Sequence, residues 1–184
     1  MRRSCAIALL AAGLILAAGA GFSQETKDGT VVKIAGLESR TPGDWVREKP
    51  SNRLRSFQFR LPRAKDDKED ADLAVLPDLP GKPEENLERW KDLFVPPDGK
   101  TIDDIARIEK FKVGKVSILL LDIAGTYLQK DRPLGSKSVP KPHYRMISVV
   151  FDTPDGAALI RMVGPERTVA KHKGAFDSWL KGFK

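Results

Sequence analysis

The spacing of hydrophobic side chains predicts strands over most of the chain. Between residues 56 and 61, Phe57, Phe59 and Leu61 alternate with polar side chains, and this period of two is typical of a strand with one buried face. The segment 116–128 is hydrophobic at both parities, which predicts an inner strand covered on both sides. Shorter hydrophobic segments bounded by turn residues predict further strands at 30–37, from residue 45, and at 73–76, 106–113, 144–152 and 157–163.

Two segments have helical spacing instead. Pro83 and two glutamates open the first, in which hydrophobic side chains recur every three or four residues as far as Phe94. Gly164-Pro165 opens the second, a C-terminal helix with a hydrophobic stripe from Val169 to Phe183. Because runs of strands joined by hairpins dominate the order, we expect an α+β fold. Its antiparallel sheet should have about six to seven strands, with the mid-chain helix and the C-terminal helix packed on it.

The first residues have the pattern of a secretory signal peptide. Arg2 and Arg3 precede an uncharged stretch, 6–20, that is short for a membrane span. Cleavage after Ala20 or after Ser23 would give a secreted or periplasmic protein, whereas a retained segment would anchor a membrane-tethered structural protein. The predicted organisation is a signal peptide at 1–23, a polar leader at 24–29 and a single α+β domain at 30–184.

The composition limits the kinds of site that the chain can form. The chain has one cysteine, Cys5, and two histidines, so we expect no disulfide, no metal site and no cofactor. The net charge is +7, and removal of Arg2 and Arg3 would lower it by two to +5. Arginines and phenylalanines interleave between 53 and 60, but in an exported protein this pattern indicates a core strand with snorkelling arginines rather than a surface for nucleic acid.

The order of these features resembles a known architecture. A Pro-Gly-Asp-Trp turn at 42–45, a long antiparallel sheet and a last helix ending in Trp179-Leu180 resemble the PsbP-like α/β/α sandwich. That architecture occurs in photosystem accessory proteins and in a nuclear-import factor that binds a small GTPase. The runs RLRSFQFRLP, ENLERW and GTY resemble uncharacterised secreted bacterial proteins. The resemblance implies an accessory or binding role, and it transfers no site residue because no functional motif matches.

Asp122 is the most conspicuous single residue, because it lies within a run of leucines and isoleucines. A carboxylate buried there must be paired or hydrogen-bonded. It is therefore either an internal anchor or an acid/base group with a perturbed pKa. The anchor is favoured, since the same strand holds no histidine and no second carboxylate.

The segment 129–143 predicts a long loop, because it contains three prolines and no hydrophobic period. It carries one acid, Asp131, against an excess of cations, and Tyr144 follows it. We interpret it as a basic lip for an anionic partner, either a protein or an envelope component, or as a plain connection between edge strands. The candidate binding residues are Lys130, Arg132, Lys137, Lys141, His143 and Tyr144.

These features favour an exported, non-enzymatic binding or accessory protein over an enzyme. No nucleophile elbow, phosphate-binding loop or dinucleotide motif occurs. The alternative is an exported hydrolase, which requires Asp122, His143 and Tyr144 to converge within hydrogen-bonding reach.

Overall fold

The computed structural model describes residues 28–130, 137–154 and 156–184, and it confirms the α+β class. The predicted signal peptide and the first part of the leader, as far as residue 27, lie outside the described residues. In the described part of the chain, no helix is long and apolar enough to cross a membrane. The helices are α1 (Pro83–Lys91), α2 (Ile102–Ile105) and α3 (Glu166–Lys181).

The main sheet has eight strands, slightly more than expected, and all of its pairs are antiparallel. Its order is β3-β4-β5-β10-β9-β8-β6, and β7 pairs with the first half of β8 at the same edge as β6. Strands β1 (Val31–Ile34) and β2 (Leu37–Arg40) form a separate hairpin. The strands of the main sheet are β3 (Val46–Glu48), β4 (Phe57–Leu61), β5 (Ala71–Leu79), β6 (Phe94–Val95), β7 (Ala106–Val113), β8 (Val116–Lys130), β9 (Ser138–Thr153) and β10 (Gly156–Pro165).

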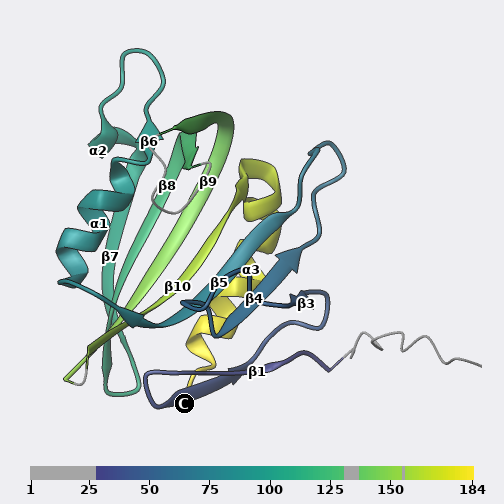
Figure 1. The fold of residues 1–184 in the computed structure, drawn as a ribbon, viewed down its shortest axis with the longest axis vertical. Coiled ribbons are helices and arrows are strands. Elements are labelled where there is room, and N and C mark those ends of the chain that lie inside the picture. The colour runs from purple at the N-terminus through teal and green to yellow at the C-terminus, as the bar shows by residue number, and fades with distance from the viewer. Residues whose placement is uncertain (1–27, 131–136, 155) are drawn as a thin grey trace, which may run out of the picture.

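A hydrophobic core lies on each face of the sheet. Even-numbered positions of β8, such as Leu120, join the core beneath α3, and odd-numbered positions, such as Leu121, join the core beneath α1. This confirms that β8 is covered on both sides. Figure 1 shows α3 against the half of the sheet that contains β10, β5 and β4, with α1 and α2 near the opposite edge. The layers are therefore helix, sheet and helix.

Aromatic side chains fix α3 on its face. The Phe176 ring is fully buried, stacks at 6.4 Å on Trp45 and meets Trp179 edge-on at 5.9 Å between ring centroids. The chain end closes the same layer, because the backbone N–H groups of Glu38 and Lys184 donate to each other's carbonyl groups. The C-terminus is thereby held against the β1–β2 hairpin.

Three local predictions need correction. The expected strand at 30–37 is a hairpin, because Ala35 and Gly36 both have positive φ (52° and 75°), as a two-residue type I′ turn requires. The expected first helix stops at Lys91, and Phe94 instead enters β6 opposite Tyr127. The short helix α2, with its capping box of Thr101 and Asp104, was not expected. The turn at Gly114-Lys115 forms where it was predicted, with Gly114 at a φ of 58°.

We expect Phe176→Ala to lower the free energy of unfolding by about 3–5 kcal/mol, since it empties the centre of the core beneath α3. Urea denaturation of the domain measures this change. Leu54→Ala is the control, because Leu54 is 68% exposed and its loss should change stability by less than about 0.5 kcal/mol. Equal effects of the two substitutions would contradict the assigned core.

Candidate functional site

The segment predicted as a loop is largely a two-stranded arm. Lys130 belongs to β8, and the residues from Ser138 to His143 belong to β9. Residues 131–136, which include Arg132, lie outside the described residues. Strand β10 ends at Pro165 opposite Tyr144, so before Tyr144 the only described strand that pairs with β9 is β8. We call residues 126–130 and 137–143 the β8–β9 arm.

A bulge in β9 lies at the root of the arm and includes His143. Gly125 pairs with Tyr144 and Tyr127 pairs with Lys141, so Thr126 alone faces two residues of β9. His143 takes a left-handed backbone with a φ of 57°, which is uncommon for a side chain other than glycine. The bulge re-aims His143 and leaves Tyr144 on the opposite face.

Glu69 clamps the root of the arm. Its two carboxylate oxygens accept hydrogen bonds from Lys141 Nζ at 2.6 Å and from the Tyr144 hydroxyl at 2.5 Å. The bonds from Lys141 and then Tyr144 hold the pKa of Glu69 below its ordinary value. Burial, followed by the bond to Glu69, raises the pKa of Tyr144, so its hydroxyl stays protonated and donates. Lys141 and Tyr144 are therefore structural parts of this root.

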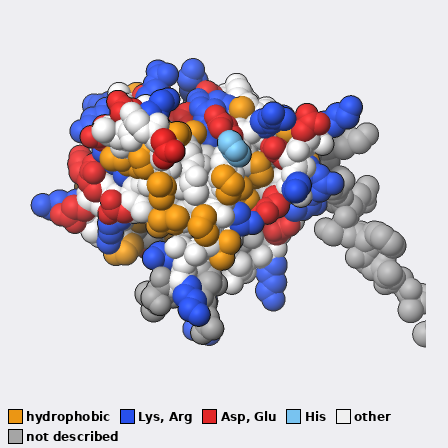
Figure 2. Space-filling model, turned by 90° about the horizontal axis from the view of Figure 1, so that it is seen from above, with side chains coloured by type: hydrophobic (Ala, Val, Ile, Leu, Met, Phe, Trp, Pro, Cys, Tyr) orange, Lys and Arg blue, Asp and Glu red, His pale blue; other side chains and the backbone are white. Residues whose placement is uncertain are grey.

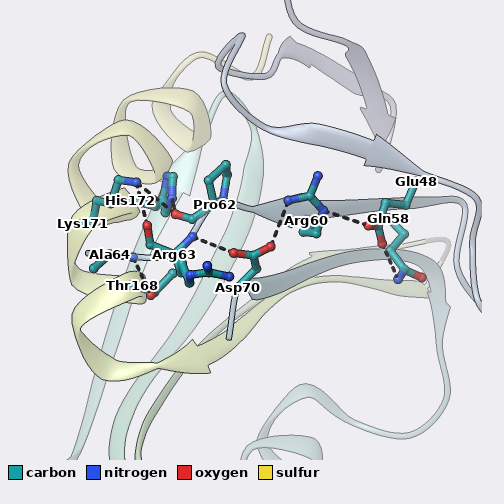
Figure 3. A network of polar contacts seen from close by, with 10 residues as sticks. All are labelled: Glu48, Gln58, Arg60, Pro62, Arg63, Ala64, Asp70, Thr168, Lys171 and His172. Atoms are coloured by element: carbon teal, nitrogen blue, oxygen red, sulfur yellow. Dashed lines mark hydrogen bonds and ion pairs between the residues drawn. The ribbon is translucent and has the colours of Figure 1, made fainter. Parts of the chain in front are cut away.

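The connection between β4 and β5, which carries Glu69, is itself bonded to α3 (Figure 3). Thr168 Oγ accepts from the Ala64 N–H at 3.0 Å, and Pro62 O accepts from the buried His172 Nε2 at 2.9 Å. Lys171 Nζ adds bonds to the same stretch, at 3.0 Å to Pro62 O and 3.2 Å to Arg63 O. The clamp thus stands on a segment fixed at several points.

His143 lines a cleft of about 650 Å³ between this connection and the start of α3. Much of its acidic lining is already engaged. Asp67 Oδ2 accepts from the N–H and hydroxyl of Thr168, and Asp66 lies 3.5 Å from Arg167. Within the described residues, no group of three acidic, histidine or cysteine side chains is placed to hold a metal ion. The lining residues are Asp66, Asp67, His143, Glu166, Arg167 and Ala170.

Asp122 forms an ion pair rather than a free carboxylate. Arg145 Nε and Nη2 donate to its two oxygens at 2.7 and 2.6 Å, and the side chain is only 12% exposed. This pair also raises the pKa of Arg145. Its bonds to Arg145 are contacts of the kind that an internal anchor makes.

The hydrolase arrangement is not assembled. Asp122 and its partner Arg145 lie on the α3 face, because neighbours of the same parity join that core. Tyr144 lies on the α1 face, where its ring stacks on Tyr127 at 6.0 Å and its hydroxyl is bound by Glu69. The sheet separates Asp122 from Tyr144, so the convergence of Asp122, His143 and Tyr144 that the hydrolase alternative requires is not formed.

Figure 2 views the end of the molecule that lies at the top of Figure 1. Hydrophobic side chains gather in the middle of this end, and acidic and basic side chains surround them. Two exposed hydrophobic residues belong to the strands on either side of β8: Val95 of β6 is 45% exposed and Val139 of β9 is 52% exposed. This end therefore combines apolar area with charge.

Comparisons with known proteins add a likeness in fold. No protein-family model matches the chain, and no curated protein matches its sequence. The structure is similar to the solution structure of cyanobacterial PsbP (CyanoP) from Synechocystis sp. PCC 6803, with 13% identity and a TM-score of 0.49 over 92% of this chain and 98% of that one. The PsbP-like sandwich is the architecture that the sequence resembled. At this identity the likeness concerns the fold, and nothing about function follows from it.

The sequence did not reveal Glu69, His143's cleft or the strand character of the arm. Glu69 lies in a run of charged residues that is typical of a solvated hairpin connection. Its hydrogen-bonding partners, Lys141 and Tyr144, are more than seventy positions away in the sequence. The one available signal was the Tyr144 side chain next to a basic segment, which calls for a hydrogen-bonding partner when it is partly buried.

We expect Asp122→Ala to destabilise the protein by about 3 kcal/mol, because Arg145 would keep its charge in a partly buried site without a partner. Thermal or urea unfolding measures the effect. The double variant Asp122→Leu with Arg145→Leu removes both charges and should be closer in stability to the unaltered protein. A double variant no more stable than Asp122→Ala would contradict the ion-pair account.

The Glu69 clamp should weaken in acid. Since the folded pKa of Glu69 is depressed, its contribution is present in full above its ordinary pKa of 4.5 and is lost as pH falls through the lower folded value. Glu69 is half exposed, so we expect less than about 1 kcal/mol. The stability gap between the unaltered protein and Glu69→Gln, measured by urea unfolding from neutral pH downward, should shrink below pH 4.5. A gap that stays constant would count against the clamp, and Glu84→Gln on α1 controls for a general charge effect.

Proposed function

We propose that this protein is an exported binding protein whose β8–β9 arm contacts an anionic partner. One observation carries the proposal: the described residues of the arm hold three lysines and no carboxylate. Of these lysines, Lys141 is neutralised by Glu69, whereas Lys130 and Lys137 are exposed and form no ion pair with any described residue. The free cations lie at the outer end of the arm and the paired one lies at its root.

The structure of the arm supports a role in binding. Its backbone is paired by ladder hydrogen bonds as far as Lys130 and Ser138, and Glu69 ties its root to the body. A segment that is already ordered loses less conformational entropy on association than a free loop would. Exposed Val139, between Lys137 and Lys141 in the sequence, adds apolar area that a partner can cover. The arm therefore offers charge together with a small hydrophobic contact.

The N-terminal pattern supports export and so indicates where a partner lies. A basic pair, an uncharged stretch and small residues near Ala20 and Ser23 form the order of a signal peptide. Polyanions of the envelope, or an acidic envelope protein, are then the partners with matching charge. The excess of cations would also speed encounter with such a surface at low ionic strength.

Binding rather than chemistry is favoured by what the candidate groups do. Asp122 is paired with Arg145, and the Tyr144 hydroxyl donates to Glu69. The two pairs lie on opposite faces of the sheet. Each of these groups has a stabilising role that accounts for its burial.

The test reverses charge on the arm and compares a matched pair elsewhere. Lys130→Glu with Lys137→Glu should weaken capture of the mature chain by anionic envelope material about tenfold, equivalent to about 1.4 kcal/mol. Lys112→Glu with Lys115→Glu is the control, since these exposed lysines flank the hairpin at the other end of β8 and give the same net charge. Binding is measured with labelled protein residues 24–184 on envelope fractions and on anionic and zwitterionic vesicles.

The two double variants must first show the same melting temperature. Selective loss in the arm variant, reduced further by added salt, supports the proposal. Equal binding of the two double variants would contradict it, because net charge and not the arm would then be responsible.

A further inference from the structure

We propose that Arg161, together with Ser148, forms a second site, which binds the carboxylate group of an external ligand on the α1 face of the sheet. Arg161 stands in the middle of β10, one of the inner strands. Its direct partners in the register are Ser148 on β9 and Ala74 on β5. The site is separate from the β8–β9 arm and does not depend on its function.

The parity of neighbouring residues places all three on one face. On β10, Leu159 belongs to the core beneath α1, and Arg161 has the same parity. On β9, Val150 belongs to that core and Ser148 shares its parity. Ala74 is fully buried and brings only a methyl group to the register position opposite Arg161.

Both polar groups lack an internal partner. The Nε atom of Arg161 and the Oγ atom of Ser148 are buried and form no hydrogen bond with any described residue. A buried donor without a hydrogen-bond partner costs about 1–3 kcal/mol, and a charged one costs more. Because these two groups lie directly opposite each other on adjacent strands, one acceptor bound from outside could complete both.

The carboxylates nearby are already used. Asp72 lies on the same face at a diagonal position on β5, but both of its oxygens accept from Arg55 Nη1, at 3.0 and 2.9 Å. Asp70 is bound to Arg60, further toward the β3 edge. Among the described residues, no carboxylate forms an ion pair with Arg161.

The opposite face shows how such an arginine is completed. Arg145 on β9 directs Nε and Nη2 at both oxygens of Asp122 on β8, in the two-point geometry that suits a planar carboxylate. Arg161 also projects from an inner strand, but its neighbours supply a hydroxyl and a methyl group instead of an acid. The carboxylate of a ligand would fill the corresponding place, and the Ser148 hydroxyl can donate to it.

The side chains around Arg161 indicate the character of the ligand beyond its carboxylate. Hydrophobic side chains flank Arg161 along and across the strands, among them Leu159, Val163, Met146 and Val150. Arg161 as a whole residue is half-buried, although its Nε atom is buried. A carboxylate attached to an apolar chain fits these surroundings. Its charge would pair with Arg161 in a low-dielectric site, and its chain would lie against the hydrophobic side chains.

The experiment titrates the full mature chain with octanoate and follows the Arg161 Nε–H resonance by nuclear magnetic resonance. We expect saturable binding that shifts this resonance toward that of Arg145. Octanol, which has the same chain without the charge, and inorganic phosphate, which is not planar, should bind at least about tenfold more weakly. Phosphate binding as tight as octanoate would overturn the carboxylate assignment, and octanol binding as tight would overturn the role of Arg161.

Two variants separate the site from general stability. Arg161→Gln should abolish the response to octanoate. Ser148→Asp should also abolish it, but it would place an internal carboxylate opposite Arg161 and raise the melting temperature, which a merely misfolded variant would not do. Arg60→Gln, on the same face but already paired with Asp70, is the control and should bind octanoate normally. Unchanged octanoate binding by Arg161→Gln or Ser148→Asp would refute the site, whatever the arm variants do.

Discussion

The pairing of β8 with β9 is the constraint on which the rest of this structure depends. The inner halves of both strands are hydrophobic at both parities, so each must be covered on two sides. One helix cannot cover both faces of the sheet. Helix α3 covers one face and α1 covers the other. The outer halves of the same strands run past the end of β10, where they form the arm. Core and arm are consequences of one long ladder.

Charge is distributed across this sheet by pairing between neighbouring elements. Arg145 holds Asp122, Arg55 holds Asp72 and Arg60 holds Asp70, so these three arginines are neutralised within the fold. Arg161 in the sheet and the outer lysines of the arm, Lys130 and Lys137, form no ion pair with a described residue and are available to an anion. A partly buried free arginine and an exposed free lysine differ in kind, since the first requires a shaped ligand and the second tolerates any polyanion.

The elements that the sequence predicted well are those determined by local pattern. The strand at 56–61, the turn at Gly114 and the C-terminal helix each follow from a period or a turn residue within a few positions. The arm was mistaken for a loop because Pro140 and Pro142 cannot donate ladder hydrogen bonds. That loss is tolerated where β9 lies beyond β10 and has an unpaired side. Glu69 was missed for another reason: its partners depend on tertiary contacts that no local pattern encodes.

The connection between β4 and β5 explains how the arm keeps a fixed direction. One part of it is bonded to α3 through Ala64 and Pro62, and another part, Glu69, is bonded to Lys141 and Tyr144. A bulge with a strained His143 is tolerated at the arm's root because these bonds on both sides determine the backbone around it. The direction of the arm is therefore set relative to α3, on the other side of the sheet from Tyr144.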